Sequence, residues 1–305
     1  MKMRRIRENL RLLGDIESIM TAMKNLSSIE LIKLAKFLSA GETAMETMET
    51  AAADLLGWFP KLREIIGSVP AEIAVIVGSE KGFCGNFNDS ILQKLAELRS
   101  GPWKHCPKLI TIGRKLGGKL DSDPDLLETL EGPSVAEEVS DIVHQVTNAV
   151  RSAIRSNGRA FSWAVIYNQM TSHGFHTVVE YPLNKLSESE VKLHPYPPVT
   201  NLPGRPLFSQ LIDEYLFGAL HQIFYRSLRA ENQRRLQHMG GAIDLLEKKR
   251  EKMVRLMNRM RQETITEEIE VMLLSAEAAS DGGLIATGEK ILSTTDGDNQ
   301  QFLLN

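Results

Sequence analysis

Apolar residues recur at steps of three and four through both ends of the chain, while prolines divide the middle. All twelve prolines lie between Pro60 and Pro206. Because proline removes a backbone donor and clashes with the preceding helical turn, the two proline-free arms permit uninterrupted helices. In the first arm the pattern predicts a helix over residues 2–58, about 85 Å long. Its apolar stripe consists of Met3, Ile6, Leu10, Leu13, Ile16, Met20, Met23, Leu26, Ile29, Ile32, Ala35 and Leu38, and it continues to Leu55.

The last arm carries the same pattern from residue 207 to residue 280, which predicts a helix of about 110 Å. Two striped helices from opposite ends of a chain, returned toward each other by a middle domain, bury their stripes most simply as an antiparallel coiled coil. The second helix is longer, so about 25 Å of it is expected to project as a single helix. Residues 281–305 are rich in Gly, Ser, Thr and Asp, and we expect them to form a disordered tail.

The middle of the chain alternates strand and helix patterns. Residues 74–77 predict a strand ending at Gly78, residues 86–98 a capped helix, and residues 109–112 a second strand. Ser134 and Glu137 have the spacing of a capping box, which predicts a helix from residue 134 toward residue 157. Residues 161–170 and 175–183 predict a hairpin across 171–174.

This pattern predicts four parts. They are a coiled-coil helix over 1–59, a Rossmann-like α/β domain over 60–206, a second coiled-coil helix over 207–280, and the tail over 281–305. The expected fold class is therefore α/β, combined with a long antiparallel coiled coil of the N- and C-terminal helices.

Composition excludes several classes of protein. The chain has 36 basic and 39 acidic residues and a formal charge of −3, so no global excess points to nucleic acid. Cys84 and Cys106 are the only cysteines, and their spacing supports neither a disulfide scaffold nor a zinc module. Cys84, beside two glycines, is interpreted as a small buried residue. No apolar run approaches the roughly 20 residues of a membrane helix.

Two short motifs could carry chemistry, but each has a simpler structural interpretation. The loop Gly78–Asn86 lies between a strand and a helix, where a nucleotide loop would lie. Its spacing places Lys81 before Gly82, unlike a phosphate-binding loop, so we interpret it as a tight turn that holds no cofactor. His173 and His176 have no third ligand at zinc-site spacing, so we interpret them as solvated loop histidines. The sequence thus predicts no catalytic set and no metal site.

Local charge is less even than the total. Residues 226–261 contain eleven basic and four acidic side chains, and residues 262–281 then contain six carboxylates and no basic group. The N-terminus is also basic. Two basic segments on one coiled coil favour an acidic partner surface around it, whereas the acidic end argues against a phosphate backbone as that partner.

At this point three separated segments resemble the gamma subunit of rotary F-type ATP synthases, the central-stalk rotor. Thr21–Lys24 is similar to the T-x-A-M-K signature of the family, and Ser79–Asn88 to its S-D-R-G-L-C-G-x-F-N loop. In the last arm, the block Glu231–Asp244 matches at several positions, and Asn258–Gln262 followed by Ile265–Ile269 is similar to N-K-A-R-Q…I-T-x-E-I. The resemblance covers residues 3–280 in the order of the family.

The resemblance implies a non-catalytic subunit that transmits torque. Its implied partners are the alpha and beta subunits around the coiled coil, and the epsilon subunit and the membrane ring of c subunits at the α/β domain. The expected place is peripheral, on the cytoplasmic face of the cell inner membrane. The residues expected to contact the head are Met23, Lys24, Arg235, Arg261 and Gln262. Those expected to contact the foot partners are Gly82, Phe83, Cys84, Gly85 and Asn86.

The chain departs from the family at two places, and two other functions stay open. Glu17–Met20 stands where the family usually has a basic segment, and Gly240 and Gly241 replace better helix formers at a cost of about 1 kcal/mol each. An unrelated coiled-coil adaptor would lack alpha and beta partners. A nucleotide-dependent enzyme with helical oligomerisation arms would bind nucleotide saturably.

Overall fold

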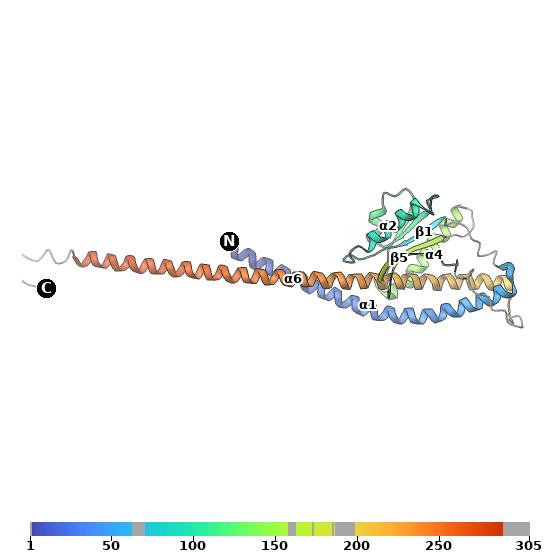
Figure 1. Ribbon diagram of the computed structural model, residues 1–305, viewed down its shortest axis with the longest axis horizontal. Coiled ribbons are helices and arrows are strands. Elements are labelled where there is room, and N and C mark those ends of the chain that lie inside the picture. The colour runs from blue at the N-terminus through green and yellow to red at the C-terminus, as the bar shows by residue number, and fades with distance from the viewer. Residues whose placement is uncertain are drawn as a thin grey trace, which may run out of the picture. The chain divides into compact units, whose positions relative to one another are not determined.

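Two long helices come from the two ends of the chain (Figure 1). The computed structural model describes residues 2–62, 71–157, 163–172, 174–184, 186 and 199–288. α1 spans Lys2–Trp58 and α6 spans Gly204–Gly288, so both predicted arms are helical. α6 includes Pro206 in its first turn, where the missing backbone donor has no helical partner to lose. It also continues past the boundary expected at residue 280, while residues 289–305 of the predicted tail lie outside the described residues.

The chain divides into two compact units. One unit is Ser18–Asp244, which contains the sheet and the parts of α1 and α6 that pack on it. The other consists of Met1–Glu17 and Leu245–Asn305. Within this second unit, Arg250 Nη1 lies 3.5 Å from Glu17 Oε2, so α1 and α6 also meet there. The units cut both long helices, whereas the sequence pattern divides the chain at the helix ends, near residues 59 and 206.

The first unit contains a five-stranded sheet in the spatial order β3-β2-β1-β4-β5. Its strands are β1 Ile73–Val77, β2 Lys108–Ile112, β3 Leu126–Leu130, β4 Trp163–Thr171 and β5 Gly174–Glu180. β1 pairs in parallel with β2 and β4, β2 pairs in parallel with β3, and β4 and β5 form an antiparallel hairpin. The predicted strands at 74–77 and 109–112 and the predicted hairpin are confirmed. The helices between the strands are α2 Phe87–Ser100, α3 Arg114–Leu120 and α4 Val139–Asn157.

β3 and α3 do not follow from the pattern of apolar positions. β3 lies at the sheet edge, and Leu127 in its middle is 50% exposed, so its residues show no buried alternation. α3 contains Gly117 and Gly118, which are poor helix formers. A Cβ at position 117 would lie 2.3 Å from Thr129 Cγ2 of β3, so the glycine lets this helix pack closely on the edge strand.

The two faces of the sheet are buried by different helices. Val75 and Val77 of β1 face a core shared with α4 and α6, while Ala74 and Ile76 face a second core with α2 and α3. This follows from the two-residue period of a strand, and burial on both faces is typical of parallel sheets. The core on the α6 face also contains Leu34 of α1. The sheet, α4, α6 and α1 therefore share one hydrophobic core.

Along α1 and α6 the contacts run in opposite directions, as expected for an antiparallel pair. Ala52 and Leu56 of α1 pack with Phe208 and Tyr215 near the start of α6. Farther along α6, Tyr225 stacks on Phe37 with ring centroids 5.3 Å apart. Later residues of α6 thus contact earlier residues of α1, which confirms the predicted antiparallel arrangement in this unit.

The start of α4 differs from the expected capping box. The Ser134 N–H donates to Glu138 Oε2 at 2.6 Å, so the reciprocal carboxylate is not that of Glu137. A single 3-10 turn, Ala136–Glu138, precedes the helix, which begins at Val139. Glu137 instead accepts a hydrogen bond from Lys33 Nζ of α1 at 2.9 Å. The expected box is wrong because α1 takes one of its members.

Gly113, between β2 and α3, should not tolerate a side chain. Its φ is +98°, and an added Cβ would lie 2.7 Å from the backbone oxygen of Ser79. We expect Gly113→Ala to lower the free energy of unfolding by about 2 kcal/mol or more, through strain and collision with backbone. The matched control is Gly118→Ala in α3, where no atom lies within 4 Å. It should raise stability by up to about 1 kcal/mol. Urea unfolding measures the free energy of unfolding of both variants. Equal changes in the two would contradict the claim that position 113 has no room for a Cβ.

Candidate functional site

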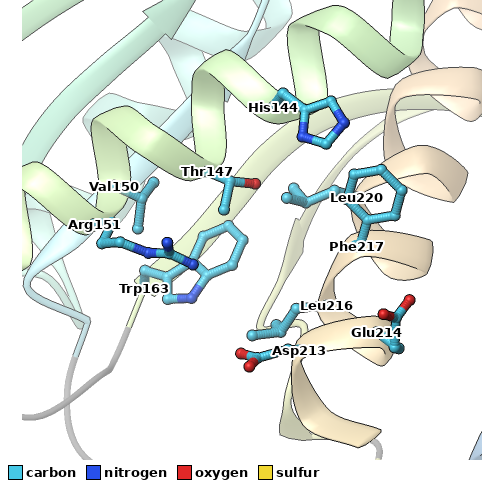
Figure 2. A pocket seen from close by; sticks show the side chains of 10 residues that line it. All are labelled: His144, Thr147, Val150, Arg151, Trp163, Asp213, Glu214, Leu216, Phe217 and Leu220. Atoms are coloured by element: carbon cyan, nitrogen blue, oxygen red, sulfur yellow. The ribbon is translucent and has the colours of Figure 1, made fainter. Parts of the chain in front are cut away.

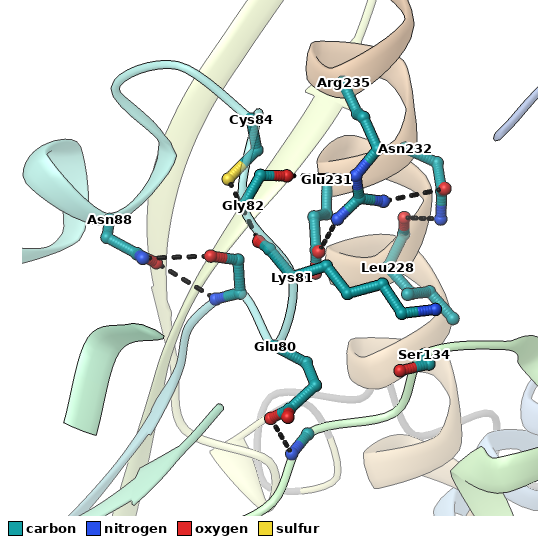
Figure 3. A network of polar contacts seen from close by, with 12 residues as sticks. Glu80, Lys81, Gly82, Cys84, Asn88, Ser134, Leu228, Glu231, Asn232 and Arg235 are labelled. Atoms are coloured by element: carbon teal, nitrogen blue, oxygen red, sulfur yellow. Dashed lines mark hydrogen bonds and ion pairs between the residues drawn. The ribbon is translucent and has the colours of Figure 1, made fainter. Parts of the chain in front are cut away.

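The loop Gly78–Asn86 follows β1 and leads into α2, and it lies against α6 (Figure 3). Its first part is held by Asn88, whose Oδ1 accepts from the Ser79 N–H at 3.0 Å and whose Nδ2 donates to Ser79 Oγ at 2.9 Å. Phe83 has a φ of +64°, which is uncommon for a residue with a large side chain, and it is 55% exposed. The loop is thus a bonded turn that presents one aromatic ring to solvent.

The carboxylate of Glu80 is held at the carboxyl edge of the sheet. It accepts from the backbone N–H of Arg114 at 3.0 Å and from that of Gly132 at 2.9 Å, and it pairs with the Arg114 side chain. These donors follow the carboxyl ends of β2 and β3, the edge at which α/β sheets commonly bind ligands. Burial tends to raise the pKa of Glu80, but these hydrogen bonds and the guanidinium outweigh it and lower the pKa. The chain's own carboxylate therefore occupies these two backbone donors.

Arg235 of α6 connects this loop to the helix. Its side chain is ion-paired with Glu231, donates from Nη1 to Asn232 Oδ1 at 3.0 Å, and donates from Nε to the Gly82 carbonyl at 3.3 Å. Arg235 and Glu231 are each only 4% exposed. We call Gly82, Glu231, Asn232 and Arg235 the polar seam. The Arg235–Glu231 pair lies within α6, so it is the bond from Arg235 Nε to the Gly82 carbonyl that joins the loop to the helix. Loss of either member of the pair would leave a buried charge uncompensated.

Arg234 makes a second connection beside the polar seam. Its side chain donates to Asn86 Oδ1, and its guanidinium carbon lies 4.9 Å from the centre of the Phe175 ring of β5. Asn86 precedes α2 as expected, but its side chain makes no capping bond to that helix. Its amide oxygen serves the contact with α6 instead, so the predicted cap is wrong.

A third polar connection joins the domain to α1, and the sequence analysis missed it. Glu30 Oε2 accepts from the Ala136 N–H at 3.2 Å, and Lys33 Nζ lies 3.1 Å from Glu30 Oε1 and 2.9 Å from Glu137 Oε1. Glu30 is 8% exposed. A carboxylate on the buried side of α1, one turn before Leu34, was the available signal for this contact. Its partner could not be found by spacing because Ala136 offers only a backbone group.

The predicted contact residues fall into three groups. Arg235 and Cys84 are buried and bonded inside the chain, and their contact with other subunits stays a prediction. Gly82 and Asn86 are engaged by α6, whereas Phe83 and Gly85 are exposed. The remaining four lie on the long helices: Met23 and Lys24 are half-buried on α1, and Arg261 and Gln262 are exposed on α6 in the other unit.

The interpretation of Cys84 as a small buried residue is confirmed, since it is 5% exposed and burial raises the pKa of its thiol. His173 lies outside the described residues. His176 is exposed, and its ring is hydrogen-bonded with Gln169 and with the Gly174 carbonyl. Within the described ranges, no group of three or more His, Cys, Asp or Glu side chains is arranged to hold a metal ion. No helix in those ranges is both long enough and apolar enough to cross a bilayer.

The sequence profile of the ATP synthase family matches residues 2–279. The chain belongs to the gamma-chain branch of this family. It is 25% identical to the ATP synthase gamma chain of Clostridium botulinum over 284 residues, which cover 90% of this chain and 96% of that one. It is 26% identical to the gamma chain of Caldanaerobacter subterraneus subsp. tengcongensis over 215 residues, which cover 65% and 70% of the two chains.

Solved structures show the same fold. A chain of the Euglena gracilis mitochondrial ATP synthase, in a structure of OSCP, F1 and c-ring, superposes with a TM-score of 0.57 at 16% identity, covering 97% of this chain and 99% of that one. A chain from the rotor of the same synthase has a TM-score of 0.56 at 14% identity, with coverage of 87% and 99%. These likenesses support the assigned fold class, an α/β domain with two long helices.

The polar seam should contribute strongly to stability. We expect Arg235→Ala to lower the free energy of unfolding by about 3–5 kcal/mol, because it leaves the buried Glu231 carboxylate without its partner. The control is Arg229→Ala, an exposed arginine on the same helix, for which a change within about 0.5 kcal/mol is expected. Urea denaturation followed by circular dichroism measures both. Similar losses in the two variants would show that the seam contributes little.

The stability contributed by Glu231 should depend on pH. Burial raises its pKa from the ordinary 4.5 to about 7, although Arg235 opposes the shift. A carboxyl whose pKa is raised by folding contributes stability that is present below pH 4.5 and lost as the pH rises to about 7. Glu231→Gln, which does not titrate, should therefore destabilise less at pH 8 than at pH 5. Urea unfolding of the unchanged protein and of Glu231→Gln at the two pH values tests this. A loss of unfolding free energy in the variant that is larger at pH 8 than at pH 5 would contradict it.

Proposed function

We propose that this chain is the central-stalk rotor subunit of a rotary F-type ATP synthase or ATPase. It transmits torque between the membrane c-ring and the catalytic head of alpha and beta subunits, and it catalyses no step itself. The observation that carries this proposal is the family match over residues 2–279, together with relatives that are matched over 96% of their length. The structures of synthase rotors to which the fold is similar support it.

The packing in the first unit suits torque transmission. The sheet, α4, α6 and Leu34 of α1 belong to one core, so the α/β domain cannot rotate about the helices without opening that core. The polar seam on α6 and the contacts of Glu30 and Lys33 on α1 add directional bonds at separate places. A torque applied to the domain would therefore pass to both helices together.

Asymmetry allows such a shaft to affect three equivalent catalytic sites differently. The α/β domain and the side chains of two unlike helices give the subunit no rotational symmetry. One face of the helix pair can contact only one beta subunit in a given way at a time. The difference in contact energy between the three sites is the coupling free energy that biases their nucleotide states.

The proposed contacts with the head are Met23 and Lys24 on α1 and Arg261 and Gln262 on α6. Support comes from the next turns of α6, where large apolar side chains remain exposed, including Ile265, Ile269, Met272 and Leu273 at 46–68%. A run of exposed apolar groups on a helix is typical of a surface that another protein covers. The basic residues 226–261 favour acidic surfaces in the same partner.

Phe83 and Gly85 are the proposed contacts with the epsilon subunit and the c-ring. The loop holds the Phe83 ring outward in a strained backbone conformation, and such strain is frequent at functional sites. The subunit is placed on the membrane only through its partners, on the cytoplasmic face of the cell inner membrane. An enzyme that binds nucleotide at this loop is disfavoured, because Glu80 already fills the backbone donors of Arg114 and Gly132.

Co-purification tests the assignment directly. The tagged chain, isolated from native membranes, should bring down alpha and beta subunits in a constant ratio together with ATPase activity. An unrelated adaptor would lack these partners. Calorimetry of the isolated chain with ATP should show no saturable binding, and saturable binding would favour the nucleotide-dependent enzyme instead.

The end of α6 should be needed for coupling. Removal of residues 262–305 deletes Gln262 and the exposed apolar turns, so we expect a severalfold loss of ATP-driven ion pumping by reconstituted complexes. ATP hydrolysis should fall less than pumping, because the catalytic sites lie in other subunits. The control deletes only residues 289–305 and leaves all described turns of α6 in place. Unchanged pumping after the longer deletion would show that these turns of α6 are not part of the contact surface.

A further inference from the structure

A cavity of about 370 Å³ lies between α4 and α6, above the first residue of β4 (Figure 2). All its lining residues belong to the unit Ser18–Asp244. Cavities that bind small organic molecules commonly measure roughly 300–1,000 Å³, so this one has room for a small ligand. It lies at the amino end of β4, whereas the loop Gly78–Asn86 follows the carboxyl end of the parallel strand β1. It is therefore separate from the polar seam and the contacts proposed above.

The floor of the cavity is apolar and preformed. Val150, Trp163 and Leu220 are 6%, 7% and 2% exposed and belong to the core shared by the sheet and α6. Leu216 and Phe217 are half-buried and pack against the same core. Since these side chains are fixed by the core behind them, the cavity does not need a rearrangement to open. Two aromatic side chains, Trp163 and Phe217, line it, and aromatic rings favour contact with another ring.

The rim of the cavity carries opposite charges from two different helices. Arg151 approaches from α4, and Asp213 and Glu214 come from α6, with Trp163 between the two helices (Figure 2). Among the described residues, none of these three groups has an ion-pair partner. Other charged groups of the same unit, such as Glu80 and Arg99, are paired. Unpaired charges of opposite sign at the rim of an apolar cavity are complementary to a ligand with two charges of its own.

Each charged group favours a definite partner. The guanidinium of Arg151 can donate two parallel hydrogen bonds to a carboxylate. Asp213 and Glu214 accept hydrogen bonds from an ammonium group, and an ammonium is also attracted to the faces of aromatic rings. A ligand with only one charge would leave one side of the rim unpaired. A neutral apolar molecule would desolvate both sides without compensation.

We propose that this cavity binds a small organic zwitterion whose ammonium and carboxylate groups are separated by an apolar, preferably aromatic, body. The carboxylate lies toward Arg151, the body lies on Trp163 and Phe217, and the ammonium lies toward Asp213. The site does not depend on the proposed rotor function, because its residues are not among the subunit contacts proposed above.

The test uses calorimetry on the purified full chain with 4-(aminomethyl)benzoate as the probe. Its matched controls are 4-methylbenzoate, which lacks the ammonium, and 4-methylbenzylamine, which lacks the carboxylate. The zwitterion should bind saturably with a dissociation constant of about 1 mM or below, and each control about tenfold more weakly. Equal affinity for all three compounds would overturn the proposal, as would no saturable binding of the zwitterion.

Two variants assign the charges to their residues. Asp213→Asn should weaken binding of the zwitterion and of 4-methylbenzylamine about tenfold and leave binding of 4-methylbenzoate unchanged. Arg151→Gln should weaken binding of the zwitterion and of 4-methylbenzoate about tenfold and leave binding of 4-methylbenzylamine unchanged. Both side chains are exposed, so the variants should fold, which thermal melts check. Asp244→Asn and Arg229→Gln, exposed positions outside the cavity, are the controls. If Asp244→Asn weakened binding as much as Asp213→Asn, or Arg229→Gln as much as Arg151→Gln, the placement of the two charges in the cavity would be contradicted.

The same titration in the assembled complex separates a small molecule from a protein partner. Binding of the zwitterion with similar affinity there supports the proposal, because the cavity is then open in the working assembly. Loss of binding only in the complex would mean that a side chain of another subunit fills the cavity, and the small-molecule assignment would be wrong.

Discussion

The packing of α6 against the sheet and α1 at the same time is the interaction on which the rest of the structure depends. Leu220, Ile223 and Phe224 lie in one core with strand residues such as Val75, and the preceding turns of α6 pack on α1. Each large side chain buried in this way contributes about 1.5–3 kcal/mol. Because α6 belongs to both contacts, the α/β domain and the helix pair form a single packed body within this unit.

Polar groups determine how the domain is oriented on that body. Hydrophobic packing is not directional, whereas the bonds of Arg235 with the Gly82 carbonyl, and of Glu30 with Ala136, each require one geometry. Their partners are buried, so a shifted register would leave charges and backbone groups unpaired. Glu80 also makes directional bonds, since its carboxylate accepts from the backbone N–H groups of Arg114 and Gly132 at the sheet edge.

Some groups without partners in the chain lie at the surfaces proposed for binding. The charges at the rim of the cavity between α4 and α6 have no partners among the described residues, and the apolar side chains from Ile265 to Leu273 are exposed. By contrast, charged groups inside the domain, such as Arg99 with Asp123, are paired at hydrogen-bond distance. Such pairs help to hold the domain in one arrangement, and the exposed groups are places where another molecule would lower the free energy.

The sequence by itself determined the elements whose signal is local. Proline-free arms with apolar residues at helical steps predicted α1 and α6, and runs such as 74–77 predicted the buried strands, because burial of one face leaves a period in the residue order. The motifs around Thr21–Lys24 and Ser79–Asn88 were sufficient to indicate the family. Only the tertiary structure decided the edge strand β3, whose residues are ordered by pairing with β2 rather than by burial. It also decided that Arg235 faces the Gly82 carbonyl. The sequence does not show whether a charged residue on a helix faces another subunit or its own chain. A distant partner such as the Gly82 carbonyl is brought near only by folding.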